Sequence, residues 1–164
     1  MAATRWCEPA PGALFGTFAA TMNKGNAARP EDKSMTENLR AKPKVLVCED
    51  EAIILMDLCM MLEECGCEVV GQCVSAQQGL QLLSTVSPDA AILDVRVKDG
   101  DVFPLARKLR DSGVGIIFHS GHAVPEQIHR EYPAANVCTK PTAAHTLMES
   151  VLDVVGAKHR MMRA

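Results

Sequence analysis

Short apolar runs alternate with stretches of amphipathic-helix spacing along the sequence from Lys44 onward. This alternation constrains the fold more than any other feature, because it is typical of proteins in which helices connect the parallel strands of one sheet. The runs are rich in Val, Ile and Leu, which predicts strands that are buried on both faces. Five strands are predicted, at Val45–Cys48, Cys67–Gly71, Asp89–Leu93, Ile116–Phe118 and Asn136–Cys138.

The stretches between the runs predict helices. After the first strand, apolar residues recur on one helical face from Ile54 and stop at Gly66. The next helix is predicted over 76–86, with Ala76, Leu80 and Leu83 facing the core, and the last has Leu147 on its apolar face and ends at Gly156. Two more are predicted, from Val102 to near Gly113 and over 125–130. These units predict an α/β fold with a doubly wound, five-stranded parallel sheet of flavodoxin-like order 2-1-3-4-5 and helices on both faces.

Residues 1–42 differ from the rest of the sequence in being rich in Ala, Gly, Pro and polar residues, without a sustained period. We predict a flexible N-terminal arm over 1–42, one folded domain over 43–156 and a short tail over 157–164, with no room for a second folded domain. Met35 is a candidate natural start. The signal-peptide pattern from Ala13 to Ala20 is weak, and apolar runs stay below the roughly 20 residues of a membrane helix, so a cytoplasmic protein is predicted.

Composition argues against several classes of function. A net charge of −3, with one Trp, one Tyr and four Phe, gives neither a basic stripe nor stacking surface, which argues against direct nucleic-acid binding. Seven cysteines lack the paired spacing of a zinc site, and their odd number suits a reducing compartment. They are predicted to be buried thiols.

Reactive polar groups stand at the ends of three predicted strands. Glu49 and Asp50 follow the first, Asp94 the third and Lys140 the fifth. The carboxyl ends of parallel strands share one edge of the sheet, so these groups are expected in one crevice. Clustered carboxylates repel one another unless a divalent cation such as Mg²⁺ binds them, and Lys140 offers a charge for a phosphoryl group.

Within this crevice Asp94 is the candidate nucleophile, since a carboxylate can form an aspartyl phosphate. Ser120, at the end of the fourth strand, is placed to donate its hydroxyl to a phosphoryl oxygen. Gly121 is expected to let the loop that follows this strand approach the site closely. Taken alone, Glu49, Asp50 and the following Glu would read as helix-capping acids. Their placement together with Asp94 and Lys140 favours a site.

These residues resemble the receiver domain of two-component response regulators, from Lys44 to Val155. Glu49 and Asp50 match its acidic pair, Asp94 its phosphoacceptor, Ser120 its switch residue and Lys140 with the following Pro its Lys-Pro motif. The resemblance implies that a sensor histidine kinase donates the phosphoryl group, that Mg²⁺ is required, and that the backbone carbonyl of Arg96 joins the metal ligands. It implies a stand-alone phosphoacceptor in a phosphorelay that signals or shuttles phosphate through a downstream or phosphotransfer protein. Such a protein catalyses only its own phosphorylation and dephosphorylation.

Some positions depart from the common receiver pattern. Val137 stands where receivers commonly have Tyr or Phe, and the loop 95–101 and the stretch 118–122 resemble the single-domain "FAT GUY" subgroup. We expect phosphorylation to draw Ser120 toward Asp94 and to reorder 119–132. Arg96 is expected to shield the acyl phosphate or to aid its loss. His119 and His122 are expected in loop or partner contacts, and the fourth helix and fifth strand form the expected contact surface.

Two alternatives stay open at this point. One is a pseudo-receiver, a binding module that keeps the fold and is not phosphorylated. The other is a phosphatase of the haloacid-dehalogenase type, which also uses Asp, Ser or Thr, and Lys on an α/β sheet. That class expects a second Asp two residues after the nucleophile, where this sequence has Arg96.

Overall fold

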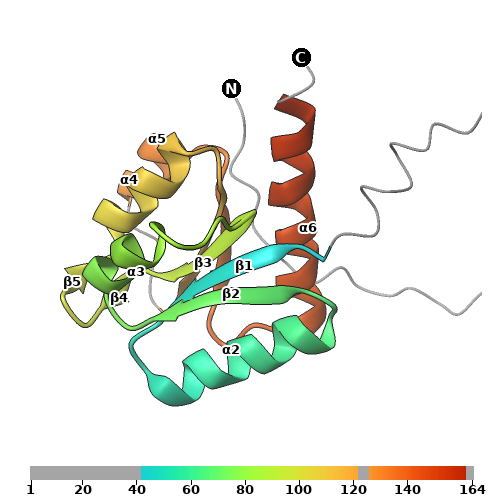
Figure 1. Ribbon diagram of the computed structural model, residues 1–164, viewed down its shortest axis with the longest axis horizontal. Helices are drawn as coiled ribbons and strands as arrows, with labels where there is room; N and C mark the ends of the chain where they lie inside the picture. The colour runs from blue at the N-terminus through green and yellow to red at the C-terminus, as the bar shows by residue number, and fades with distance from the viewer. Residues whose placement is uncertain (1–41, 122–125, 162–164) are drawn as a thin grey trace, which may run out of the picture. The chain divides into compact units, whose positions relative to one another are not determined.

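Five parallel strands form the central sheet of the protein. The structure is a computed structural model that describes residues 42–121 and 126–161. The sheet has the order β2-β1-β3-β6-β7, with parallel pairing throughout (Figure 1). This order confirms the predicted flavodoxin-like order 2-1-3-4-5, since β6 and β7 are the fourth and fifth of the long strands along the chain. Their bounds are β1 Lys44–Cys48, β2 Glu68–Cys73, β3 Ala90–Asp94, β6 Gly115–Ser120 and β7 Asn136–Thr139.

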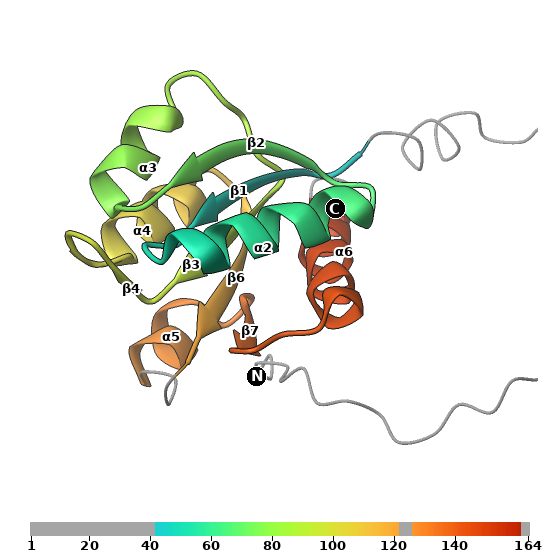
Figure 2. The ribbon, with the colours of Figure 1, turned by 90° about the horizontal axis from the view of Figure 1, so that it is seen from below.

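Helices cover both faces of the sheet (Figure 2). Helices α2 (Ala52–Glu64) and α6 (Ala144–Met161) pack on one face, and α3 (Ala76–Leu82), α4 (Phe103–Asp111) and α5 (Glu126–Glu131) pack on the other. Each face has its own apolar core.

The central strands explain why the sequence shows continuous apolar runs. Residues 45–48 of β1 and 90–93 of β3 have no exposed surface. Leu46 and Leu93 belong to the core under α3, α4 and α5, whereas Val47 and Ile92 belong to the core under α2 and α6. Because each face is covered, neighbouring residues of one strand are all apolar.

Two predicted helix features are wrong. Helix α6 does not end at Gly156 but continues to Met161, since a glycine inside a helix costs only about 1 kcal/mol relative to alanine. The first residues of the predicted tail 157–164 are therefore helical. Helix α3 ends at Leu82 rather than near 86, and Leu80 is exposed. The close contact with α4 is made by Gly79, where an added Cβ would collide with the side chain of Leu105.

A small ribbon follows β3, where the sequence predicted only a loop. Strands β4 (Arg96–Val97) and β5 (Gly100–Asp101) pair antiparallel, and Gly100 supplies a φ of 126° in the turn. Such two-residue strands have no periodicity of their own, so no sequence pattern could announce them.

The thiols behave as predicted within the described residues. Cys48, Cys59, Cys67, Cys73 and Cys138 are buried, Cys65 is half-buried, and none of these six forms a disulfide bond among the described residues. The pKa of the Cys48 thiol is raised, mainly by a hydrogen bond with Cys73 and also by burial. The reactive thiolate is therefore disfavoured. The predicted N-terminal arm, apart from Lys42, and Met35 lie outside the described residues.

Candidate functional site

The predicted site residues meet at the carboxyl edge of the sheet. Glu49 and Asp50 follow β1, Asp94 ends β3, Ser120 ends β6 and Lys140 follows β7. Strand register produces this alignment. It pairs Cys48 with Leu93, Asp94 with His119 and Ser120 with Thr139 across neighbouring strands.

Three carboxylates form the centre of the site. Oxygens of Glu49, Asp50 and Asp94 all lie within 4.8 Å of one another. Glu49 has no exposed surface and Asp94 is 8% exposed, whereas Asp50 is open to solvent. The cluster is therefore buried on one side and accessible from the other.

Lys140 joins two of these carboxylates. Its Nζ lies 2.7 Å from Oδ2 of Asp94 and 2.7 Å from Oε2 of Glu49. Burial alone would lower the pKa of Lys140, but the hydrogen bonds to Asp94 and Glu49 outweigh burial and raise it. The ammonium is thus held in its charged form between the two acids.

Glu49 is a buried carboxylate and not a helix cap. Glu51 occupies the N-cap position of helix α2, but its side chain makes no capping hydrogen bond to the backbone of the helix. Glu49 Oε1 accepts a 3.3 Å hydrogen bond from the Glu51 N–H. Burial and the charge of Asp94 raise the pKa of Glu49, against the opposing effect of Lys140. These contacts favour the site over the capping alternative.

Asp94 is held in place by the ribbon that follows it. Its Oδ1 accepts a 3.2 Å hydrogen bond from the backbone N–H of Arg96. The ribbon is tied to the neighbouring helix, because the carboxylate of Asp99 accepts the N–H groups of Ala76 and Gln77 at 2.8 and 2.9 Å. The backbone of Arg96 is therefore fixed beside Asp94, while its side chain is exposed.

Ser120 is buried beside this cluster, and its carbonyl accepts the N–H of Lys140 at 2.9 Å. The Lys140–Pro141 peptide bond is cis. The role predicted for Gly121 is not required by packing here. A Cβ at that position would meet Lys140 only at an ordinary distance of 3.9 Å.

The expectation for His119 is wrong, and the sequence analysis did not place this residue in the site. It is not a loop or partner contact, since it is buried in β6 and 3% exposed. Its Nδ1 lies 4.0 Å from Oε2 of Glu49. Burial, and then the charge of Lys140, lower its pKa to about 4. His122 lies outside the described residues.

Tyr132 is a second residue that the sequence did not single out for the site. Its ring stacks on Phe103 at 6.1 Å and meets Phe118 edge-on at 5.3 Å between centroids. Its hydroxyl contacts the carbonyl of Phe103 at 3.5 Å, and the Arg110 guanidinium lies 5.4 Å from the ring centroid. Val137 is buried in the same core and pairs with Phe118 across the strands. The core thus contains an aromatic ring at the end of α5, although position 137 has none.

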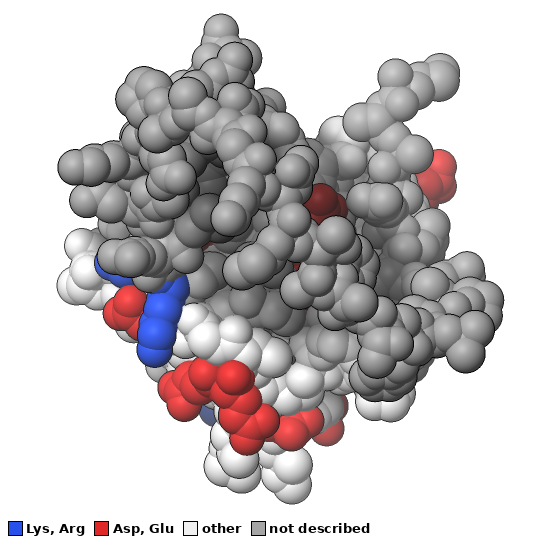
Figure 3. Space-filling view, turned by 90° about the vertical axis from the view of Figure 1, so that its right-hand side faces the viewer, with Lys and Arg blue, Asp and Glu red and all other residues white. Residues whose placement is uncertain are grey.

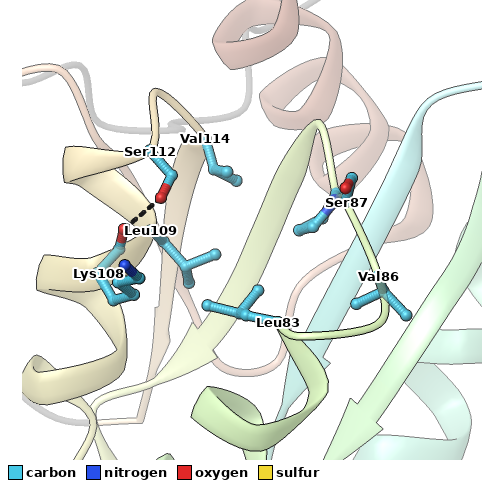
Figure 4. A pocket seen from close by; sticks show the side chains of 8 residues that line it. Leu83, Val86, Ser87, Lys108, Leu109, Ser112 and Val114 are labelled. Carbon is cyan, nitrogen blue, oxygen red and sulfur yellow. Dashed lines mark hydrogen bonds between the residues drawn. The ribbon is translucent and has the colours of Figure 1, made fainter.

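A separate hollow of about 230 Å³ lies between α4 and the segment after α3 (Figure 4). Leu83, Pro88 and Leu109 are among its lining residues. It borders the amino ends of β3 and β6, whereas Asp94 and Ser120 stand at their carboxyl ends. The hollow therefore belongs to the other end of the sheet from the acidic cluster.

The sequence model of the response regulator receiver domain matches residues 45–152. The chain belongs to the response regulator receiver family. This membership agrees with the strand order and with the acidic cluster, and it removes the haloacid-dehalogenase alternative. Arg96, where that class requires an acid, also has its side chain in solvent.

A curated relative matches part of the chain. The chain is 36% identical over 74 residues to the transcriptional regulatory protein PdtaR of Mycobacterium tuberculosis, which is 45% of this chain and 36% of PdtaR. The chain thus matches about a third of the length of that relative.

Among solved structures, a receiver protein from Sinorhizobium medicae is 28% identical, with a TM-score of 0.65 over 73% of this chain and 98% of that one. The receiver domain of a modulated diguanylate cyclase from Desulfovibrio desulfuricans is 25% identical, with a TM-score of 0.68 over 74% and 99%. The PhyR receiver domain of Erythrobacter litoralis shares the fold at 19% identity, with a TM-score of 0.62 over 72% and 93%. These likenesses establish the receiver fold and leave the subgroup unresolved.

The carboxylates present fit the Mg²⁺ that receivers use. Their oxygens are the hard ligands that Mg²⁺ prefers, and the burial and repulsion that raise the pKa of Glu49 are relieved by a cation. Within the described residues, no helix combines the length and apolar character that crossing a bilayer requires.

Proposed function

We propose that this receiver accepts a phosphoryl group on Asp94 from a sensor histidine kinase and signals, or passes phosphate on, through protein contacts. The observation that carries the proposal is the position of Lys140, whose ammonium lies 2.7 Å from both Asp94 and Glu49. The nucleophilic carboxylate of Asp94 therefore lies beside a positive charge, Lys140, and beside two further carboxylates, Glu49 and Asp50, that can bind a metal. Asp94, Lys140 and Ser120 are the proposed catalytic residues.

The chemistry follows from these positions. Asp94 forms a P–O bond to the phosphorus of the donor as the P–N bond to the donor's imidazole breaks, and the imidazole keeps that electron pair. Phosphoryl transfer depends mostly on positioning and charge neutralisation. Lys140 supplies one positive charge, and Arg96 orients the nucleophile through its N–H.

Glu49, Asp50, Asp94 and the backbone carbonyl of Arg96 are the proposed Mg²⁺ ligands. Bound there, Mg²⁺ supplies charge neutralisation for the phosphoryl oxygens. Ser120 is proposed to donate its hydroxyl to the phosphoryl group and to move toward Asp94 on phosphorylation.

An apolar stripe on α2 supports a helical partner at the edge of the site. Ile53, Met56 and Met60 are 80%, 60% and 53% exposed and recur at i, i+3 and i+7, on the side of α2 that faces away from the core. A partner that brings a phosphohistidine to Asp94 must lie against the elements around the cluster, and α2 begins two residues after Asp50. This surface differs from the fourth helix and fifth strand that the sequence suggested.

Acidic residues flank the stripe and narrow the chemistry of the partner. Asp57, Glu63 and Glu64 are exposed on the same helix. The face in Figure 3, at the end of the molecule where α2 ends, also shows more acidic than basic side chains on its described part. We therefore propose that the kinase presents an apolar helical ridge with basic flanks.

Incubation with acetyl phosphate and Mg²⁺, followed by intact mass, tests the proposal. The expected result is one phosphoryl group per chain, which Asp94→Asn abolishes and chelation of Mg²⁺ prevents. An unmodified wild-type chain under these conditions would favour the pseudo-receiver alternative. We further propose a cytoplasmic protein of the "FAT GUY" subgroup, with a receiver domain over 43–156 and an N-terminal arm over 1–42.

A further inference from the structure

His119 is a buried imidazole whose hydrogen-bonding capacity is unused. Within the described part of the chain, neither Nδ1 nor Nε2 has a hydrogen-bond partner, and the side chain is 4% exposed. Buried polar groups without partners are rare in proteins, because each one loses its hydration without compensation. An apolar residue would fill this place in β6 at lower cost, so the imidazole needs an explanation.

The position of His119 points to Glu49. Its ring lies on the same side of the sheet as Glu49, because residue 119 follows Phe118 of the opposite core and alternates with it. Oε2 of Glu49 is 4.0 Å from Nδ1, just beyond hydrogen-bond distance. That oxygen is itself paired with Lys140 at 2.7 Å in this structure.

Phosphorylation changes what Lys140 can do. Its ammonium is shared between Glu49 and Asp94 while Asp94 is a free carboxylate. A phosphoryl group on Asp94 carries about −1.5 to −2 charges and draws the ammonium toward its own oxygens. Oε2 of Glu49 then loses its partner at a position with no exposed surface.

We propose that His119 is a positioning residue that donates its Nδ1–H to Glu49 once Lys140 turns to the phosphoryl group. A movement of about 1 Å brings the pair into hydrogen-bond distance. The bond keeps Glu49 aimed at the metal, as groups behind a metal-binding carboxylate do elsewhere. This inference rests on the proposed function, since it assigns a role in the phosphorylated state.

Two substitutions separate the hydrogen bond from the packing. His119→Met has similar volume and no donor. His119→Asn places an amide N–H near the position of Nδ1 and keeps a donor. His145→Met, at an exposed histidine of α6, is the matched control. The measurements are urea unfolding without Mg²⁺, Mg²⁺ affinity, and affinity for beryllium trifluoride, a phosphoryl mimic, at saturating Mg²⁺.

His119→Met is expected to bind beryllium trifluoride about 10- to 100-fold more weakly than wild type. Its unfolding free energy without Mg²⁺ is expected to equal or exceed that of wild type, since two unpartnered nitrogens are removed. Its affinity for Mg²⁺ alone changes less, because Lys140 still holds Glu49. His119→Asn recovers most of the loss, and His145→Met shows none.

Unchanged binding of beryllium trifluoride by His119→Met overturns the inference, as does equal weakening by Met and Asn, which would indicate packing alone. Asp94→Asn defines the baseline without a phosphoryl site. If folded wild type also binds no beryllium trifluoride, the proposed function fails and this inference fails with it. If wild type binds and His119→Met binds equally, the inference alone fails.

Discussion

The ammonium of Lys140 donates a 2.7 Å hydrogen bond to Oδ2 of Asp94, although 46 positions separate the two residues. The same Nζ lies 2.7 Å from Glu49. One positive charge therefore holds two buried carboxylates together when no cation is bound. Removal of Lys140 and removal of the metal should both increase the repulsion between the carboxylates of Glu49 and Asp94.

Lys140→Met is expected to destabilise the metal-free protein by about 3 kcal/mol, because removing one partner leaves buried charge without compensation. Added Mg²⁺ should restore more stability to this variant than to wild type, since it supplies the missing positive charge. Urea unfolding with and without Mg²⁺ measures both effects. Lys98→Met, at an exposed lysine of the β4–β5 turn, is the control. A similar loss in that control would contradict the assignment.

Acid should weaken the fold through His119. Its pKa falls from 6.5 to about 4 because of burial and Lys140. Because the folded state disfavours the protonated imidazole, protonation costs no stability above pH 6.5, and stability is lost as the pH falls from 6.5 through about 4. The shift corresponds to about 3 kcal/mol.

Urea unfolding of wild type and His119→Met across this pH range measures the effect. The difference between their unfolding free energies should shift in favour of the variant as the pH falls. Glu49 opposes this trend in both proteins, since its raised pKa makes its ionisation destabilising as the pH rises. Parallel curves for the two proteins would show that His119 does not titrate in this way.

The fold and the central site residues could be predicted because their signals are local. Strands β1 and β3 are covered on both faces, so burial appears in the sequence as unbroken apolar runs. Glu49, Asp94 and Lys140 follow such runs directly, and parallel register then brings strand ends to one edge.

The remaining features depend on contacts between distant segments. The α3–α4 contact is made by Gly79 and not by Leu80 as predicted, because the two helices approach closely at Gly79. His119 has no local sign of burial beside Glu49, which comes from another strand. The β4–β5 ribbon depends on hydrogen bonds that the Asp99 carboxylate accepts from the backbone N–H groups of Ala76 and Gln77.

Met56→Lys should reduce phosphotransfer from the cognate kinase about tenfold or more, since it places a charge in the middle of the apolar stripe on α2. Phosphorylation by acetyl phosphate should not change, because Met56 is exposed and is not part of the acidic cluster. Leu80→Lys, at an exposed leucine of α3, is the matched control. Equal losses with both phosphate donors would indicate damage to the site instead of to the docking surface.

Tyr132 should connect the site to α5. Its ring packs edge-on against Phe118, which stands two residues before Ser120. Tyr132→Ala is expected to cost about 3–4 kcal/mol in unfolding free energy, as for other buried aromatic residues. Tyr132→Phe should cost less than about 1 kcal/mol, because the contact of the hydroxyl with Phe103 is long at 3.5 Å.

NMR with beryllium trifluoride and Mg²⁺ tests the connection itself. In wild type, amide shifts should change both around Asp94 and in α5. In Tyr132→Ala the changes around Asp94 should persist while those in α5 shrink, because the ring that transmits displacement from β6 is gone. Tyr132→Phe retains the ring and should behave as wild type. Undiminished shift changes in α5 of the Ala variant would mean that another path carries the signal, since no ring at position 137 can replace the one that was removed.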